Sequence, residues 1–305
     1  MKARNLRVGV FTTNTAIIVA DAKEFLQKEN IRVEIDYVTD SPTLLRNLID
    51  GKYDIIFANA DNVISWSEGQ GADPQTNDLL IFLGGSQGVN QKLVVAPDIN
   101  DFADLRGRVF AVDAPTTGYA IVGIFILKTH GLELSRDYRF KSFGNTAARA
   151  EALTRGLASG AMMGMDNEIE KRGFRVLARA EEYVKHYARG LGTTRRQWAD
   201  ANEDLLVRFS RAMIRATDWI LDSKNKEEVM GILSLMSKID ANQAQALYEE
   251  ALSAQFGLTP HSRIDKEGIR AAIELRESVG LMRSPVPNAE KYVDERFYKI
   301  ALATL

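Results

Sequence analysis

Two short polar stretches have side chains whose types and spacing suit the binding of a small molecule. One follows the apolar run at residues 7–11, and the other follows the apolar run at 108–112. Hydroxyl and amide groups donate and accept hydrogen bonds, and a glycine lets a ligand approach the backbone closely. Threonine at such a junction also serves as a helix N-cap, so capping and ligand contact both stay open for each threonine. The candidate ligand contacts here are Thr12, Thr13, Asn14, Thr116, Thr117, Gly118 and Tyr119.

A third polar stretch, N-A-D-N at residues 59–62, follows another apolar run. Asn59, Asp61 and Asn62 offer donors and acceptors for a small polar ligand. The same side chains could instead hold the loop in place, and the sequence leaves both roles open. The stretch T-D-S-P-T at 39–43 is interpreted only as a helix start, because serine before proline is typical of one.

The sequence contains no recognisable catalytic motif. His130, His186 and His261 lie far apart without a metal-ligand spacing, and the chain has no cysteine. Motifs typical of a nucleophile elbow, a P-loop or a dinucleotide-binding loop are absent from the sequence. We therefore predict no catalytic residue, no metal site and no cofactor.

The chain contains an internal repeat. The pattern T-T-x-x-A-I occurs at residues 12–17 and again at 116–121, and each copy is followed downstream by R-x-L-x-x-G. An apolar strand then ends in an aspartate, which is Asp61 in the first copy and Asp166 in the second. From the first threonine to the aspartate the two copies span 49 and 50 positions. Two related α/β units explain this order better than coincidence does.

Strand and helix patterns alternate through roughly the first 190 residues, and the rest of the chain is mostly helical. This alternation predicts parallel sheets covered by helices. Ligands of such sheets lie beyond the carboxyl ends of the strands, where helix N-termini present unpaired N–H groups. Two facing units would therefore direct the polar stretches at a shared cleft. The expected strands are 7–11, 31–38, 54–59, 79–84, 92–97, 108–112 and 161–165, and the expected helices between them are 15–29, 41–51, 118–131 and 145–160.

The order of these segments resembles the solute-binding proteins of ABC importers. It is most similar to the nitrate, taurine and sulfonate group, which also includes binders of thiamine-pyrimidine precursors. The resemblance implies a type II periplasmic-binding-protein fold, with two α/β lobes, mostly parallel sheets, two crossover segments and a helical C-terminal tail. It is carried by SPTLLRNLIDGKYDIIFANAD (41–61), FADLRGRVFAVDAPTTGYA (102–120), RGLASGAMMGMDNE (155–168) and RGFRVLARAEEY (172–183).

The resemblance also implies a division of the chain. Residues 1–88 and 191–305 would form the first lobe, and residues 89–190 the second, with crossings near 85–91 and 187–194. The family's binding loops fall on the polar stretches named above. They add Ser86, Asn145, Thr146 and Asp166 to the implied ligand-binding residues.

Two departures from the family pattern bear on the ligand. The late strand of the second lobe is the apolar G-A-M-M-G-M-D, where family members commonly have an acidic residue at its start. Arg149 is the one arginine near the predicted cleft, whereas Asp61 and Asp166 would each repel an anion. A strongly anionic ligand such as nitrate or a sulfonate is therefore not expected.

Composition limits the partners. The chain has 39 Lys+Arg and 41 Asp+Glu, a net charge of -2, and no long run of one sign, so nucleic acid is not an expected partner. The N-terminus enters a strand directly, without the apolar segment of a signal peptide. Together with the resemblance, this favours the mature form of a periplasmic protein, or of an extracellular membrane-anchored one, that acts as a monomer.

We therefore predict an extracytoplasmic solute-binding protein of an ABC importer. It would capture a small polar or aromatic organic solute by lobe closure and deliver it to a membrane permease. The alternative is a cytosolic enzyme on the same fold that acts on a pyrimidine-like substrate, which turnover would distinguish from stable binding. A sensory effector domain is a third possibility, but no DNA-binding or signalling segment supports it.

Overall fold

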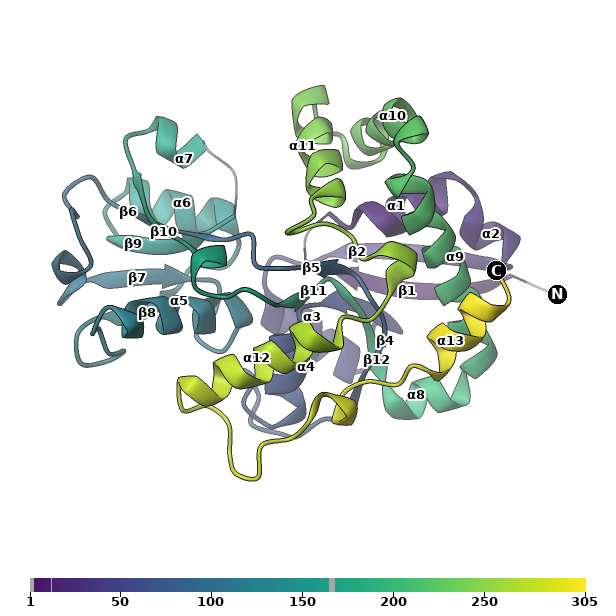
Figure 1. Cartoon of the computed structure of the whole chain (residues 1–305), viewed down its shortest axis with the longest axis horizontal. Coiled ribbons are helices and arrows are strands. Elements are labelled where there is room, and N and C mark those ends of the chain that lie inside the picture. The colour runs from purple at the N-terminus through teal and green to yellow at the C-terminus, as the bar shows by residue number, and fades with distance from the viewer. Residues whose placement is uncertain (1–2, 12, 165–167) are drawn as a thin grey trace.

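The computed structural model describes residues 3–11, 13–164 and 168–305. Two five-stranded sheets lie next to each other along the long axis of the molecule (Figure 1). We call each sheet with its packed helices a lobe, the first lobe being the one that contains the N-terminal strand. Four of the five strands in each sheet run in the same direction, which confirms the predicted α/β class with mostly parallel sheets.

The sheet of the first lobe contains two strands that are wholly buried. In spatial order its strands are β2 (Ile31–Tyr37), β1 (Arg4–Val10), β3 (Ile55–Ala58), β12 (Leu191–Arg195) and β4 (Leu79–Leu83). Every residue of β3 and β4 is buried, as expected for apolar runs with helices over both faces. Strand β12 runs antiparallel to both of these strands, because the chain returns here from the second lobe.

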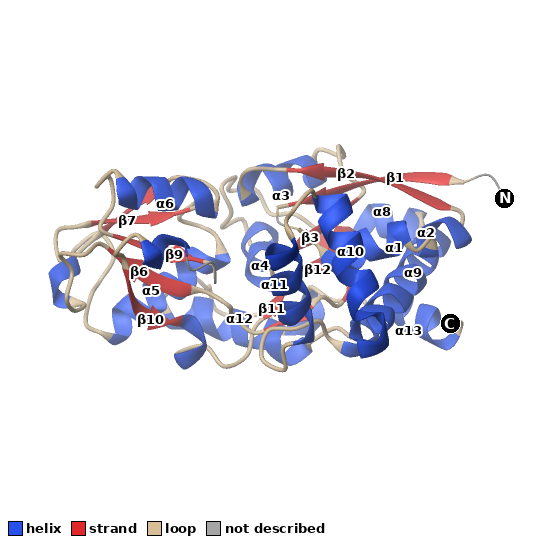
Figure 2. Ribbon diagram, turned by 90° about the horizontal axis from the view of Figure 1, so that it is seen from above, coloured by secondary structure: helices blue, strands red, loops and turns tan. Residues whose placement is uncertain are grey.

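Helices cover both faces of this first sheet (Figure 2). One apolar cluster holds α1 (Thr15–Ala22), α2 (Phe25–Lys28), α9 (Glu203–Leu221), α10 (Lys226–Ser237), α11 (Ala241–Leu252) and α13 (Arg296–Ala303). The other cluster holds α3 (Ser41–Ile49), α4 (Ala60–Ser67) and α12 (Lys266–Ser278). Short helix α8 (Arg196–Ala201) follows β12, and single 3₁₀ turns lie at Ala103–Leu105, Ala180–Glu182, Ser223–Asn225, Pro260–Ser262 and Ala289–Lys291.

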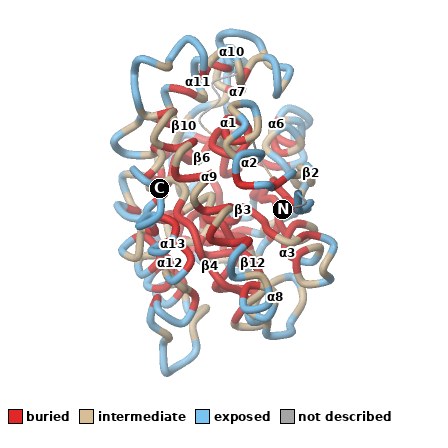
Figure 3. Tube along the Cα trace, turned by 90° about the vertical axis from the view of Figure 1, so that its right-hand side faces the viewer, coloured by how far each residue is buried: buried red, intermediate tan, exposed pale blue. Residues whose placement is uncertain are grey.

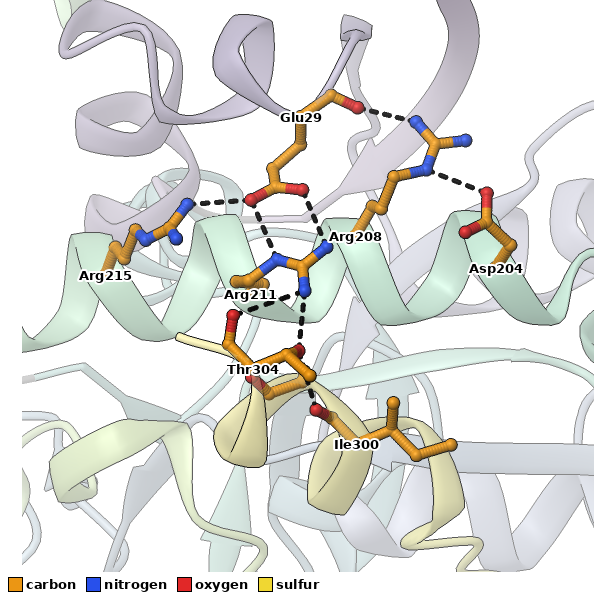
Figure 4. Close-up of polar contacts among 8 residues, drawn as sticks. Glu29, Asp204, Arg208, Arg211, Arg215, Ile300 and Thr304 are labelled. Carbon is orange, nitrogen blue, oxygen red and sulfur yellow. Dashed lines mark hydrogen bonds and ion pairs between the residues drawn. The ribbon is translucent and has the colours of Figure 1, made fainter.

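Charged side chains fix α9 to the end of α2 (Figure 4). Arg211 donates two hydrogen bonds to the buried Glu29 carboxylate, at 2.8 and 3.0 Å, and Arg215 donates a third at 2.7 Å. Arg208 donates to the Glu29 backbone carbonyl at 2.5 Å. Positions three and four apart share one helix face, so the three arginines reach the same group. A buried carboxylate requires such partners, and this cluster joins the C-terminal helices to the N-terminal sheet.

The sheet of the second lobe also has one strand that runs against its neighbours. In spatial order the strands are β10 (Arg175–Arg179), β6 (Lys92–Val95), β9 (Gly160–Met163), β7 (Val109–Val112) and β8 (Arg139–Ser142). Strand β6 is antiparallel to β10 and β9, so its first residue lies at the same sheet edge as the carboxyl ends of β7 and β9. The helices of this lobe are α5 (Gly118–Thr129), α6 (Thr146–Thr154) and α7 (Glu168–Lys171).

The chain passes between the lobes through two short paired strands. Strand β5 (Ser86–Gln87) pairs antiparallel with β11 (Ala188–Arg189), and Figure 1 shows the pair between the two sheets. These strands fall within the segments 85–91 and 187–194, where the sequence predicts the crossings. A two-residue ladder holds the two connections next to each other.

Helix α12 contacts both lobes. It packs against α4 of the first lobe and α5 of the second, and Figure 1 shows it in the lower middle of the molecule. One continuous apolar cluster therefore includes Ile64 of α4, Ile121 of α5 and Ile273 of α12. Figure 3 shows buried backbone through the middle of the molecule, surrounded by exposed helix faces. In the described part of the chain, we find no helix with the length and hydropathy needed to cross a membrane.

Candidate functional site

A cavity of about 620 Å³ lies between the lobes. Residues of both lobes, of both crossings and of the C-terminal helices line it. Its walls include strand ends and helix N-termini, the positions at which open α/β sheets bind ligands. The cavity therefore occupies the place where the sequence predicts a cleft.

The cavity brings together most of the residues predicted for the site. The predicted residues that line it are Thr13, Asn14, Asn59, Asn62, Ser86, Thr117, Gly118, Tyr119 and Thr146. Asp61, Thr116 and Asn145 are described but do not line the cavity. Thr12 and Asp166 lie outside the described residues.

Asparagines at helix starts serve the fold as well as the cavity. The Asn14 Oδ1 accepts a hydrogen bond from the Ile17 N–H at 3.1 Å and so caps α1. Asn145 caps α6 in the same way, but this side chain is exposed and does not reach the cavity. Capping and cavity lining thus coincide at Asn14, and only capping is found at Asn145.

Asn59 and Asn62 connect α4 to elements outside the first sheet. The Asn62 Oδ1 accepts from the Gly118 N–H at 3.2 Å, a contact between the two lobes. The Asn59 Oδ1 accepts from the Gly190 N–H at 3.2 Å, a contact to the second crossing. Burial raises the pKa of the Tyr119 phenol, which lies against Asn59. These residues form a hydrogen-bonded wall that spans both lobes.

Asp61 turns away from the cavity toward α12. Both of its carboxylate oxygens accept from the Arg276 Nη1, at 3.0 and 3.1 Å, and both side chains are buried. Burial raises the pKa of the Asp61 carboxyl, and the Arg276 cation opposes that rise. Arg276 also donates to the Gln70 Oε1 at 2.5 Å. In this arrangement Asp61 positions α4 against α12.

Asp113 is a buried carboxylate on the cavity wall that the sequence analysis did not select. It follows β7 and accepts hydrogen bonds from the Thr117 hydroxyl and, at 3.1 Å, from the Ser41 hydroxyl. Ser41 belongs to α3 of the first lobe, so this is a second contact between the lobes. Ser41 itself lines the cavity, although the sequence suggests only a helix start there.

Two arginines line the cavity, and each already has protein partners. Arg149 is buried and donates to the carbonyls of Met162 at 2.8 Å and Gly144 at 2.5 Å, and to the Thr146 hydroxyl at 3.1 Å. Burial lowers the pKa of the Arg149 guanidinium. These bonds tie α6 to β9, so Arg149 supports the wall of the second lobe.

Arg189 forms the second cationic group, in the strand β11. It donates to the Glu250 carboxylate at 2.7 Å and to the Phe256 carbonyl at 2.6 Å. Asn90, in the other crossing, donates to the same Glu250 oxygen at 2.6 Å. Glu250 of α11 therefore binds both crossings at the edge of the cavity. Sequence patterns give no signal for this cluster, because its members are up to 160 positions apart.

Six large apolar side chains line the cavity on the side of the first lobe. These side chains are Phe11, Leu44, Phe57, Met213, Leu247 and Leu258. They suit a ligand with a hydrocarbon or ring portion. Trp66, just after the N-A-D-N stretch, is buried and does not line the cavity.

Neither a metal centre nor a catalytic histidine is found here. No cluster of three potential ligands among His, Asp and Glu occurs within residues 3–11, 13–164 and 168–305. The three histidines do not line the cavity: His130 bonds to the Tyr183 hydroxyl at 2.7 Å, and His261 to Asp218 at 2.9 Å. The cavity groups can hydrogen-bond and enclose a small molecule.

Comparison with known protein families assigns the chain to one of them. Residues 22–197 match the family described as "ABC transporter, phosphonate, periplasmic substrate-binding protein". The match covers more than half of the chain, so the chain belongs to this family of ABC transporter substrate-binding proteins. This confirms the family recognised in the sequence.

A curated relative is YtlA of Bacillus subtilis (strain 168). It is 23% identical over 217 residues, which are 69% of this chain and 64% of YtlA. The match thus spans less than two thirds of the length of that relative.

Solved structures confirm the periplasmic-binding fold. The periplasmic nitrate-binding protein NrtA from Synechocystis PCC 6803 gives a TM-score of 0.81 at 16% identity, over 99% of this chain and 89% of NrtA. The alkanesulfonate-binding protein SsuA from Xanthomonas axonopodis pv. citri, bound to MOPS, gives 0.74 at 17% identity, over 97% of this chain and 99% of SsuA. The desulfurization enzyme DSZB gives 0.67 at 15% identity, over 98% and 99%. The fold therefore also occurs in an enzyme.

Proposed function

We propose that this chain is the extracytoplasmic solute-binding component of an ABC importer. It captures a small polar or aromatic organic solute between its lobes and delivers it to a membrane permease. One observation carries the proposal: a cavity of about 620 Å³ is lined by residues of both lobes, which are joined by the paired crossings β5 and β11. The family assignment supports the same role and the extracytoplasmic location.

The proposed mechanism is lobe closure. Residues 1–88 with 191–305 form one moving body, and residues 89–190 form the other. A solute held by Asn14 and Asn59 on one side and by Thr117 and Tyr119 on the other favours the closed arrangement, because it gains both sets of contacts only there. The Asn62–Gly118 and Ser41–Asp113 hydrogen bonds are contacts that closure would make.

Binding rather than turnover is favoured by the bonding of the charged cavity groups. Glu250 is paired with Arg189, and Arg149 is bound to carbonyl groups. A general acid or base needs a proton that it can exchange with the substrate. The DSZB fold likeness keeps an enzyme as the alternative to be tested.

A thermal-shift screen followed by recovery of the solute tests the function. The purified protein is screened with sulfonates, phosphonates, carboxylates, aromatic acids and pyrimidines, since a ligand of the folded state raises the melting temperature. We expect a stabilising compound that is recovered unchanged after prolonged incubation. Asn59→Ala should weaken its binding about tenfold, as expected for loss of a hydrogen bond on a buried wall.

A control variant and a contrary outcome make the test specific. Asn145→Ala is the matched control, because Asn145 caps a helix outside the cavity and should leave affinity unchanged. Consumption of the stabilising compound would replace the binding proposal with the enzyme alternative.

A further inference from the structure

The polar wall of the second lobe includes two hydrogen-bond acceptors at one sheet edge. Asp113 follows β7 and Gln91 precedes β6, and both line the cavity. Because β6 runs antiparallel to β9 while β7 is parallel to β9, these two residues lie at the same edge. The topology therefore brings a carboxylate and an amide to one side of the cavity.

Both acceptors have capacity left for a ligand. Asp113 is 6% exposed and accepts bonds only from hydroxyl groups in the described part of the chain, with no lysine or arginine of those residues in an ion pair with it. A carboxylate offers about four acceptor sites, so room remains. The Gln91 Oε1 is buried and has no hydrogen-bond partner among the described residues. An unpaired buried acceptor costs free energy that a ligand donor would recover.

The cations of the cavity are committed elsewhere. Arg189 pairs with Glu250, and Arg149 donates to two carbonyls and a hydroxyl. Neither lies in an ion pair with Asp113 in the described structure, although Arg149 interacts with the Asp113 charge over a longer distance. An ammonium would supply a cation in direct contact with Asp113, and an amino group has hydrogens for both Asp113 and Gln91. A hydroxyl has one hydrogen and no charge.

We propose that the solute presents a nitrogen bearing hydrogen, as an ammonium, an amino group or a ring N–H, to the Asp113 carboxylate and the Gln91 amide oxygen. This inference rests on the proposed function and specifies the chemistry of its ligand. The apolar side chains of the first lobe would then contact the remainder of the solute. Asp113 and Gln91 are specificity-determining residues in this arrangement.

The test compares compounds that differ only in replacing an amino group with a hydroxyl. Isothermal titration is done with taurine against isethionate, 2-aminoethylphosphonate against 2-hydroxyethylphosphonate, and 4-aminobutyrate against 4-hydroxybutyrate. We expect at least one amino compound to bind more than about tenfold tighter than its hydroxyl partner, because a site built for a donor rejects a poorer one.

Variants test whether Asp113 and Gln91 cause the preference for the amino compound. Asp113→Asn keeps the size of the side chain and one of its two acceptor oxygens but removes the charge. It should weaken the amino compound about tenfold or more while changing the hydroxyl partner little. Gln91→Leu has a similar volume and should weaken the amino compound several-fold. Asp98→Asn is the matched control, since Asp98 is exposed on the same lobe. Melting curves establish that each variant is folded.

The outcomes separate this inference from the proposed function. A hydroxyl compound that binds as tightly as its amino partner, or folded Asp113→Asn and Gln91→Leu variants that keep full affinity, overturns the inference and leaves solute capture intact. Failure of every compound in both series to bind the wild-type protein counts against the proposed function itself, and the inference falls with it.

Discussion

Gly118 lies where α5 of the second lobe meets α4 of the first. Its N–H donates to Asn62, and a Cβ at this position would lie 2.2 Å from the Tyr187 Oη and 3.0 Å from the Asp61 Cβ. Tyr187 is fully buried, so its ring has no free space into which to move. The sequence suggests Gly118 as a point of close ligand approach, and the structure shows a close approach of protein groups there as well.

Gly118→Ala should lower the free energy of unfolding by about 1–3 kcal/mol, the usual cost of an overpacked methyl group. Urea denaturation measures the change. Gly231→Ala is the control, because Gly231 lies inside α10, where an added Cβ would meet no described atom within 4 Å beyond the backbone of its own helix. That substitution should stabilise the protein by about 0.5–1 kcal/mol. Equal effects of the two alanines would contradict the packing argument.

Some of the residues that line the cavity could be selected from the sequence, and others could not. Thr13 and Asn62 could be selected because each follows an apolar strand, which places it at the carboxyl edge of a sheet. Glu250 could not be selected, because it lies in a regular amphipathic helix and reaches the cavity only through the packing of α11. Asp113 directly follows β7, so the same rule could have selected it, whereas its contact with Ser41 of the other lobe is visible only in the structure.

Helix α12 is the element that connects the two lobes outside the crossings. Arg276 reaches the buried Asp61 of the first lobe, and Lys128 of α5 donates to the Ser278 carbonyl at its C-terminal end at 2.8 Å. A cation at this end also suits the helix dipole. The helix therefore makes polar contacts with both lobes in addition to its apolar face.

Arg276→Met should destabilise the protein by about 3–5 kcal/mol, because it leaves the Asp61 carboxylate buried without its partner. Combining it with Asp61→Asn should cost less than the single change, since no buried charge then remains. Denaturant unfolding of the single and double variants measures the coupling. Arg270→Met, on the exposed face of the same helix, is the control and should change stability by less than about 0.5 kcal/mol. Equal costs for both arginines would disprove the role of the buried pair.

The helices and strands that the sequence predicts correctly are largely those with a uniform apolar run. The strand expected at 108–112 is β7 (Val109–Val112), and the helix expected at 118–131 is α5 (Gly118–Thr129). Strand β12 was not predicted, because L-G-T-T-R lacks an apolar run and becomes a strand through pairing with β3 and β4. The helix expected at 15–29 is two helices, since Glu24 adopts φ 59° between them. Long-range pairing and a local left-handed residue are not encoded in hydrophobic periodicity.

At the scale of the whole molecule, the two lobes share an apolar core as well as a cavity. The cluster that contains Ile64, Ile121 and Ile273 extends from the first sheet through α4, α12 and α5 to the second. The chain also crosses twice between the lobes, so the first lobe is built from two separate stretches of sequence and the second lobe from one. Relative motion of the lobes must therefore keep this core packed while the cavity side opens and closes, with the paired β5 and β11 as the link.

A shared core predicts cooperative unfolding of the two lobes. Differential scanning calorimetry should show one transition whose calorimetric and van't Hoff enthalpies agree, because neither lobe keeps its apolar surface covered when the other unfolds. Arg276→Met should move this transition to lower temperature without dividing it, whereas Arg270→Met should leave it in place. Two resolved transitions in the wild-type protein would mean that each lobe is stable alone. In that case α4, α5 and α12 would form only a weak interface, and the lobes would move as independent bodies around β5 and β11.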